Sequence, residues 1–169
     1  MIYIIKTFLG TFILISILFN SNLAFADEAT SSPKTLYETF WPLTAGKTID
    51  DPLYFLKEWK ENLRGMLVFG NPQKAEYAVF LGTKRVLEAD KLIKEGKKDF
   101  ADKTLGKASK QFDIAKNYIN NAKKSNKPLG SSEVTIKPRL ENLLNLIPTI
   151  QSNAADEVLQ KIKDLQMNL

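Results

Sequence analysis

The sequence predicts an all-α fold, a small antiparallel bundle of about four helices with a helical hairpin at its centre. Three observations lead to this expectation. From residue 51 onward, apolar residues recur at spacings of three and four, and glycine or proline interrupts the pattern at intervals typical of helix ends. No stretch alternates at period two, as a half-buried strand would. The links between the helical stretches are short, which favours antiparallel neighbours.

The first expected helix begins at Asp51-Pro52. Aspartate can accept hydrogen bonds from the free N–H groups of a first turn, and proline fits just inside that turn. One apolar stripe follows and ends at Gly70; it consists of Leu56, Trp59, Leu63 and Met66/Leu67. In a bundle, such a stripe is the face that packs against neighbouring helices.

The second and third helices form the expected central hairpin. Asn71-Pro72 repeats the start signal, the second helix runs to about Glu95, and Gly96 ends it before a third begins near Asp99. The third helix carries a narrow seam with a small residue at every other contact: Ala101, Leu105, Ala108, Phe112, Ala115, Ile119 and Ala122. This pattern predicts close packing against a partner helix.

The last helix is expected from about Pro138 to the end of the chain, after a loop over 124–137 that contains proline, glycine and serine. Its apolar residues recur at helical spacing as far as Leu165. Pro148 lies within the pattern, where it removes one backbone hydrogen bond and clashes with the preceding turn. We therefore expect a kink or break near Leu144 to Pro148.

The N-terminal residues have the features of a secretory signal peptide. Lys6 precedes an apolar run, and Ala24-Phe25-Ala26 provides a small-residue cleavage site. We expect residues 1–26 to be removed, leaving Asp27 as the mature N-terminus and the protein outside the cytoplasm. The alternative is an uncleaved membrane anchor, and only in that case is contact with a membrane expected.

Residues 27–48 are expected to be a flexible tether that includes an aromatic segment, and residues 49–169 the helical domain. The tether begins with small and polar residues, Asp27 to Lys34. The aromatic segment, Leu36 to Leu43, is too short to predict a helix of its own. It is expected to lie over the bundle as a lid.

Composition excludes several classes of function. The 169 residues contain no Cys, which excludes disulfides and the lipoprotein signal, and no His, the commonest metal ligand and general base. No nucleophile motif is present, and Asp50-Asp51 lacks the ligand pattern of a calcium loop. We therefore expect no catalytic residue, metal or cofactor, and no enzyme. The net charge of +5 is only mildly basic, so a nucleic-acid partner is not expected.

Four short motifs resemble those of a known family. They are Trp41-Pro42, Asp51-Pro52-Leu53-Tyr54-Phe55-Leu56-Lys57, Lys74-Ala75-Glu76 and Arg85-Val86-Leu87-Glu88-Ala89. They resemble the bacterial secreted or membrane-tethered proteins of domain of unknown function 5667, with Val86 where the family has Leu. The resemblance covers residues 41–121. It implies an all-helical extracytoplasmic domain and no known activity.

Arg85 and Glu88 are the first candidate site. A helical projection places Arg85 within the apolar arc of the second helix, with Glu88 one turn further on. Glu58 or Glu61 of the first helix could approach from the neighbouring helix. A buried salt bridge that fixes helix register is one interpretation; an anion site or a catalytic acid pair is the other.

The second candidate site is a lysine-rich surface. Eleven lysines and four acids lie between Lys91 and Lys127, and Lys103, Lys107 and Lys110 lie opposite the apolar seam of the third helix. This face could bind an anionic wall polymer, phospholipid head groups or extracellular DNA. It could instead be an ordinary solvated helix face, since no aromatic residues are interleaved for stacking. We expect a structural or protein-interaction module of the bacterial cell envelope with an unknown partner. The alternative is a module that binds anionic polymers through these lysines.

Overall fold

A computed structural model describes residues 35–169 of the chain. These residues contain six α-helices, one short 3-10 helix and no strand, so the expected all-α class is confirmed. The expected signal peptide, residues 1–26, and residues 27–34 of the expected tether lie outside the described part.

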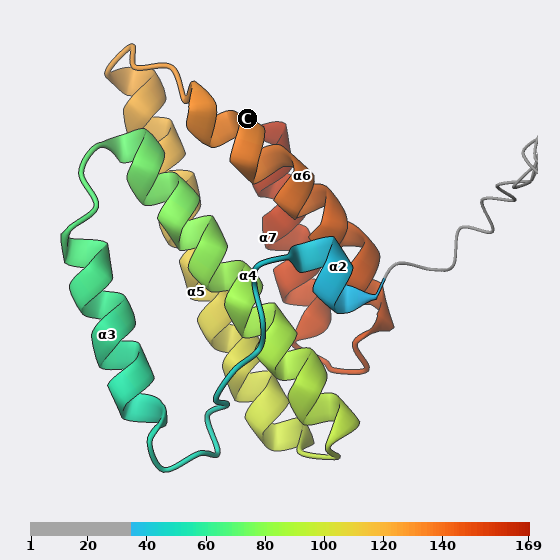
Figure 1. The fold of residues 1–169 in the computed structure, drawn as a ribbon. Coiled ribbons are helices and arrows are strands. Elements are labelled where there is room, and N and C mark those ends of the chain that lie inside the picture. Colours follow the sequence, from blue (N-terminus) through green and yellow to red (C-terminus); the bar gives the residue numbers. More distant parts are fainter. Residues whose placement is uncertain (1–34) are drawn as a thin grey trace, which may run out of the picture. The chain divides into compact units, whose positions relative to one another are not determined.

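The helices follow one another with short connections. Their bounds are α2 Leu36–Phe40, α3 Tyr54–Met66, α4 Asn71–Lys94, α5 Lys98–Lys124, α6 Ser131–Leu146, the 3-10 helix Ile147–Thr149 and α7 Ala155–Met167. From α3 to α7, successive α-helices run in opposite directions (Figure 1). Within residues 35–169, no helix combines the length and apolar character that crossing a membrane requires.

Helices α4 and α5 form the central hairpin and make the most extensive helix–helix contact in the described chain. Gly70 and Gly96, at the two ends of α4, have φ values of 89° and 76°, which lie in the left-handed region that glycine tolerates best. All seven residues of the α5 seam are buried, as their spacing predicts. The helices approach closely where Gly82 of α4 meets the Phe112 ring: a Cβ on Gly82 would lie 2.8 Å from the ring.

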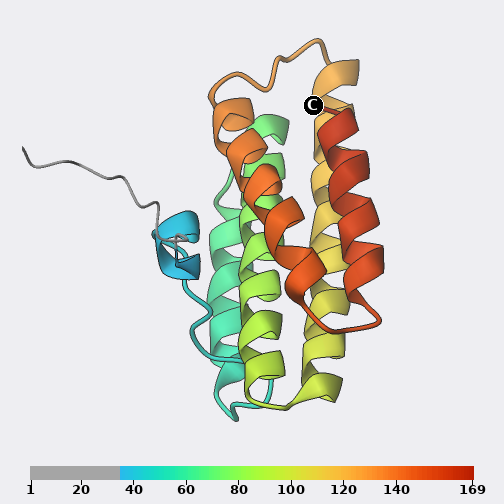
Figure 2. The ribbon, with the colours of Figure 1, turned by 90° about the vertical axis from the view of Figure 1, so that its right-hand side faces the viewer.

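The C-terminal region forms two helices where the sequence predicts one interrupted helix. The break expected before Pro148 is present: α6 ends at Leu146 and a 3-10 turn leads into α7, which runs back antiparallel to α6 (Figure 2). The expected start at Pro138 is wrong, because α6 begins at Ser131 and contains Pro138 in its interior. The buried apolar residues of α6 and α7 include Ile136, Leu140, Leu143, Val158 and Ile162.

The aromatic segment before α3 is more ordered than the sequence predicts. It forms a short helix, α2, whose first turn is capped by reciprocal hydrogen bonds between Thr35 and Glu38. Phe40 and Leu43 belong to the hydrophobic core, and the side-chain amide of Asn142 on α6 donates to the Thr39 carbonyl at 3.1 Å. Residues 35–48 therefore pack on the bundle, and the expectation of a flexible tether is wrong for this part of 27–48.

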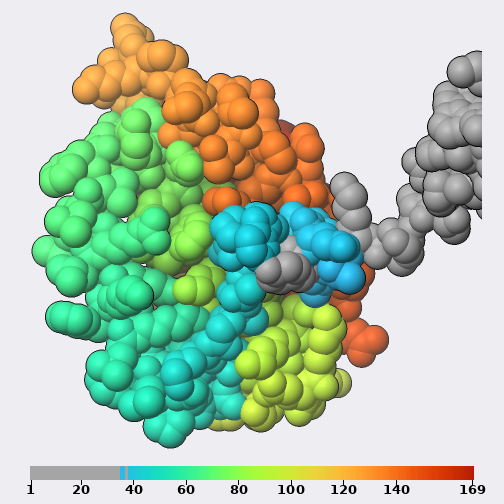
Figure 3. Space-filling view, in the orientation of Figure 1, coloured from blue at the N-terminus to red at the C-terminus, as the bar shows by residue number. Residues whose placement is uncertain are grey.

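Helix α3 differs from the others in how it is attached. Its Cα atoms rarely come within 8 Å of those of another helix. Its apolar stripe faces solvent, so the packing role that a bundle normally gives such a stripe is not observed. The exposed fractions are 66% for Trp59, 76% for Met66 and between 46% and 68% for Phe55, Leu56, Leu63 and Leu67. The side chains of α3 form the left edge of the space-filling view (Figure 3).

Candidate functional site

Arg85 lies at the centre of an ion-pair cluster that joins α3 to α4. Its Nη1 donates to Glu88 Oε1 at 2.8 Å on the same helix, and its Nη2 donates to Glu61 Oε2 on α3. The side chains are 6% exposed for Arg85 and 0% for Glu88. The structure thus brings together the pair expected from the sequence and adds Glu61 from the preceding helix, α3.

Glu88 is the most deeply buried acid of the cluster. Besides Arg85, it accepts hydrogen bonds from Lys57 Nζ and, at 3.3 Å, from the Tyr54 hydroxyl. Burial raises the pKa of Glu88 despite the neighbouring cations. Burial also lowers the pKa of Lys57 and raises that of Tyr54. These directions reflect the cost of charging groups out of water.

Glu61 connects α3 to α4 through both its side chain and its backbone carbonyl. It accepts from Arg85 and, at 2.7 Å, from Lys84 Nζ, and its backbone carbonyl accepts from the Tyr77 hydroxyl at 2.8 Å. Burial opposes ionisation of Glu61, but Lys84 and Arg85 outweigh it, and the pKa of Glu61 is lowered. Glu61 is therefore a charged group held between two cations.

The ring of Tyr54 forms one wall of the cluster. Arg85, Lys57 and Lys107 lie over it at 5.4, 5.1 and 4.9 Å from the ring centroid. A tyrosine face attracts cations through its quadrupole. Each buried side-chain nitrogen and oxygen of the described residues has a hydrogen-bond partner. The arrangement suits a clamp that fixes α3 on α4, because both ends of the Arg85 guanidinium are already engaged by carboxylates.

Tyr54, Lys57 and Lys84 complete the cluster, and sequence reasoning did not identify them as part of it. The one sequence feature that points to Tyr54 and Lys57 is their spacing from Glu61. They precede Glu61 by seven and four residues, so all three lie on one side of α3. Arg85 within an apolar arc needs partners on the facing helix. Tyr54 and Lys57 donate to Glu88, and Lys84 donates to Glu61, so these three residues support the two acids that pair with Arg85.

A basic groove borders the cluster on one side of α3. It has a volume of about 380 Å³, and its cations are Lys47, Lys57, Lys60, Arg64 and Lys84. Glu61 is its only acid. Arg64 lies 5.8 Å from the ring centroids of both Tyr77 and Phe80. Neither Lys60 nor Arg64 forms an ion pair within the described residues.

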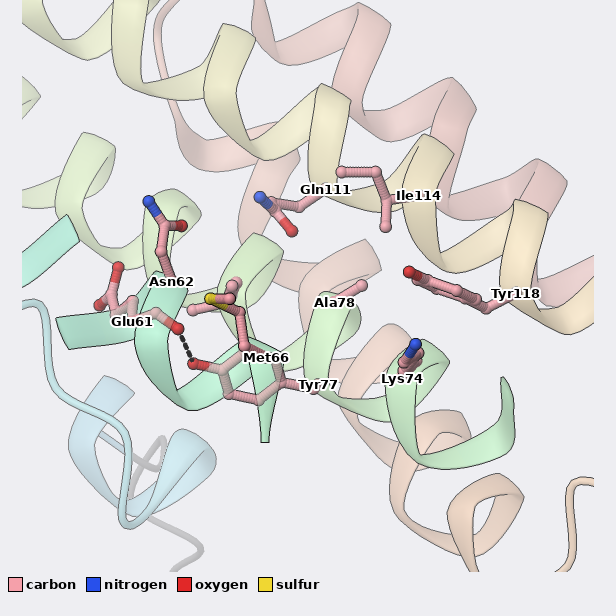
Figure 4. Close-up of a pocket in the computed structure, with 11 residues that line it drawn as sticks. Glu61, Asn62, Met66, Lys74, Tyr77, Ala78, Gln111, Ile114 and Tyr118 are labelled. Atoms are coloured by element: carbon pink, nitrogen blue, oxygen red, sulfur yellow. Dashed lines mark hydrogen bonds between the residues drawn. The ribbon is translucent and has the colours of Figure 1, made fainter. Parts of the chain in front are cut away.

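A second groove of about 460 Å³ lies on the other side of α3, between α3, α4 and α5. Figure 4 shows Met66 of α3 beside Tyr77, with Ile114 and Tyr118 of α5 across the opening. Ala78 lies between these two sides, on α4. This groove is mainly apolar, in contrast to the basic groove.

The three lysines expected to form an anion-binding face are not equivalent. Lys107 is half-buried and forms an ion pair with Glu58 of α3. Lys103 and Lys110 are exposed, and Lys103 lies 5.6 Å from the Phe100 ring centroid. The structure therefore does not present Lys103, Lys107 and Lys110 as one free cationic face. No group of acids in residues 35–169 is arranged to hold a metal ion.

The fold and the cluster define a class of protein: an all-α bundle with one amphipathic helix whose polar side faces the bundle and whose apolar side faces solvent. The chain belongs to the family described as "Domain of unknown function (DUF5667)", which matches residues 46–168. The match begins at residue 46, so it does not include Trp41-Pro42, and it continues past residue 121, where the expected resemblance ends, to include all of α6 and α7. No curated protein and no solved structure matches the chain.

Proposed function

We propose that this protein is a non-enzymatic interaction module of the bacterial cell envelope, which reaches that compartment through a cleavable signal at residues 1–26. It engages its partner through the outer face of α3. We define this outer face as the six exposed apolar side chains Phe55, Leu56, Trp59, Leu63, Met66 and Leu67.

The exposure of this face is the observation that supports the proposal. Burying a side chain of this size from water is worth about 1.5–3 kcal/mol, so six of them left uncovered on one helix are a large unused driving force. Contiguous apolar patches on soluble proteins commonly mark interaction sites. On the opposite side of α3, Glu58 pairs with Lys107 and Glu61 pairs with Lys84 and Arg85, so the helix presents its apolar side outward.

Site-specific photo-cross-linking in intact cells tests this proposal. A benzophenone amino acid replaces Trp59 in one variant and Val134 in the control, because Val134 is also exposed (75%) but lies on α6. We expect an adduct from position 59 and none from position 134. Equal labelling from both positions, or none from either, would refute an interaction through α3.

The alternative is a module that binds an anionic polymer through the lysines of α5. It has less support, because Lys107 is engaged with Glu58 and only Lys103 and Lys110 remain exposed. Counterion release makes such binding steeply dependent on salt. Salt-sensitive retention on heparin that disappears in Lys103→Ser/Lys110→Ser would favour this alternative over the outer face of α3.

A further inference from the structure

We propose that the partner of the outer face of α3 is an anionic phospholipid surface, on which the helix lies in the plane of the interface. This inference rests on the proposed function and names the partner for it. It requires no spanning segment: the apolar side chains would reach the boundary between head groups and acyl chains, while the adjacent cations contact the head groups.

The distribution of residues around α3 matches that of an interfacial helix. At about 100° per residue, the six outer-face residues occupy one uninterrupted arc of about 120°. Trp59 and Phe55 are among them, and aromatic residues suit the interface between water and lipid. Leu53 before the helix and Phe69 after it are also exposed, at 48% and 77%. Apolar side chains are therefore also exposed just before and just after α3 in the chain.

The charges beside the arc are positive. Lys60 and Arg64 border one edge, and Asn62, which is neutral, borders the other. The two acids of α3 point toward the bundle, where Glu58 pairs with Lys107 and Glu61 pairs with Lys84 and Arg85. The acids of α3 therefore lie away from its apolar arc, and the cations Lys60 and Arg64 lie next to that arc.

The basic groove extends this positive edge. Lys60 and Arg64 form one wall, and Lys47 and Lys84 belong to the same groove. A phosphate head group beside the apolar arc would meet two cations that have no acidic partner in the described chain. Each basic residue near an anionic membrane surface contributes about 1 kcal/mol of attraction.

Charge also decides between a lipid surface and a second copy of the chain. A second copy would cover the apolar arc, but its α3 has no outward acid to pair with Lys60 and Arg64. Self-association would therefore bring unpaired cations close together or leave them without a counter-charge. An anionic surface provides the missing negative charge along the whole edge.

Vesicle binding tests the inference. The protein is purified as cells export it, with Trp41→Phe so that Trp59 is the only tryptophan. It is mixed with vesicles of phosphatidylcholine alone or of phosphatidylcholine with phosphatidylglycerol. We expect the emission of Trp59 to shift to the blue, and brominated acyl chains to quench it, only when phosphatidylglycerol is present. A partition coefficient that is equal on the two vesicle types would overturn the proposal.

Two variants identify the surface that binds. Leu56→Ser/Leu63→Ser removes apolar side chains that are already exposed, so it should fold as the parent does and lose at least about tenfold in partitioning. Lys60→Gln/Arg64→Gln leaves the apolar arc intact and should lose about thirtyfold in partitioning on anionic vesicles, because two charges are removed. The control is Val134→Ser/Met167→Ser, which changes exposed apolar residues on α6 and α7. Residues 1–26, if retained, are the same in every variant.

The outcomes separate this inference from the proposed function. Loss of binding in both α3 variants and not in the control supports it. The inference is overturned if the wild-type protein does not bind anionic vesicles. It is also overturned if the protein is a dimer in lipid-free solution and Leu56→Ser/Leu63→Ser dissociates that dimer. If position 59 still gives a cross-linked protein adduct in cells, the proposed function stands with a protein partner. If position 59 gives no adduct, the proposed function fails as well.

Discussion

Arg85 joins two helices because its two terminal nitrogens donate to carboxylates on different elements, Glu88 on α4 and Glu61 on α3. The sequence predicts that Arg85, within an apolar arc, needs an acid, and it offers Glu88 together with either Glu58 or Glu61; the structure shows that Glu61 is the one that pairs. The other contributors were not predictable from spacing alone. Lys57 and Tyr54 join the cluster only because α3 turns its polar side inward, which is a property of the packing.

Replacing Arg85 tests whether the clamp is structural. Arg85→Ala should lower the free energy of unfolding by about 3–5 kcal/mol, because it leaves the two acids without their shared buried cation. The measurement is chemical denaturation followed by circular dichroism. Arg85→Met/Glu61→Leu should recover much of the loss. Lys60→Ala, at an exposed position without an ion pair, should change stability by less than about 0.5 kcal/mol.

A fully stable Arg85→Ala protein would contradict the structural interpretation. It would instead favour the other interpretation of the pair, in which the guanidinium serves a bound anion.

Glu61 makes the stability of the domain depend on acid pH. Its pKa in the folded protein lies below the ordinary value of 4.5, so its contribution is fully present above pH 4.5 and is lost as pH falls through the folded value. In Glu61→Gln, unfolding free energy should therefore fall less steeply between about pH 5 and pH 3 than in the wild type. The raised pKa of Glu88 has the opposite sign; burial, its largest cause, is present in both proteins, whereas the smaller part caused by the Glu61 charge is removed in the variant and offsets some of the difference. Identical slopes would show that Glu61 is not held as described.

At the scale of elements, the helix pattern of the sequence located α3, α4 and α5 within a few residues. Pro148 correctly marked the break that separates α6 from α7. The expected start of the last helix, Pro138, lies seven residues after the observed start of α6, because the segment from Ser131 to Lys137 carries few apolar residues and follows proline, glycine and serine. Tertiary packing of Ile136 and Ser132, both buried, offsets that weak local signal.

The hydrophobic periodicity of α3 did not predict which side of this helix faces the bundle. An apolar stripe shows that a helix is amphipathic, but not that its apolar side is covered. The polar contacts carried the missing information. Glu61 lies opposite Trp59 and Leu63 on α3, so a contact between Glu61 and Arg85 forces those apolar residues away from the bundle.

The α4–α5 contact allows a matched pair of glycine substitutions. Gly82→Ala places a Cβ 2.8 Å from the buried Phe112 ring and should destabilise the domain by about 1–3 kcal/mol. Gly106→Ala on α5 meets nothing within 4 Å and should stabilise it by about 0.5–1 kcal/mol. Thermal unfolding of both proteins distinguishes the two directions. A neutral Gly82→Ala would mean that the helices are farther apart than described.

At the scale of the whole molecule, the family motifs covered only part of the domain. They lie before residue 90, whereas the match continues to residue 168. Helices α6 and α7 have no recognisable motif, because their contribution is a set of buried aliphatic side chains that many sequences could supply. They nevertheless cover the faces of α4 and α5 that α3 leaves open, so the cooperative unit must include them.

The proposed export of the protein leads to a prediction about the mature chain. We expect the exported protein to begin at Asp27, because Ala24-Phe25-Ala26 precedes it. Intact-mass measurement of the exported product tests this. If the protein then lies on lipid through α3, a wash with high salt should release much of it from membranes, since the head-group attraction is screened. A mass that includes residues 1–26, together with resistance to that wash, would indicate an uncleaved anchor.

The attachment of α3 by ion pairs also determines how the domain fluctuates. Swinging this helix away would break charged contacts, and its outer-face side chains, already 46–76% exposed, would gain less new exposure than fully buried ones would. Such an opening should respond weakly to denaturant and strongly to ionic strength. In native-state hydrogen exchange, the amides of α3 should therefore exchange through a local opening that salt promotes, well before those of α4 and α5. Helix α3 would then be the part of the domain that can most easily change its orientation on a surface, while α4, α5, α6 and α7 stay folded.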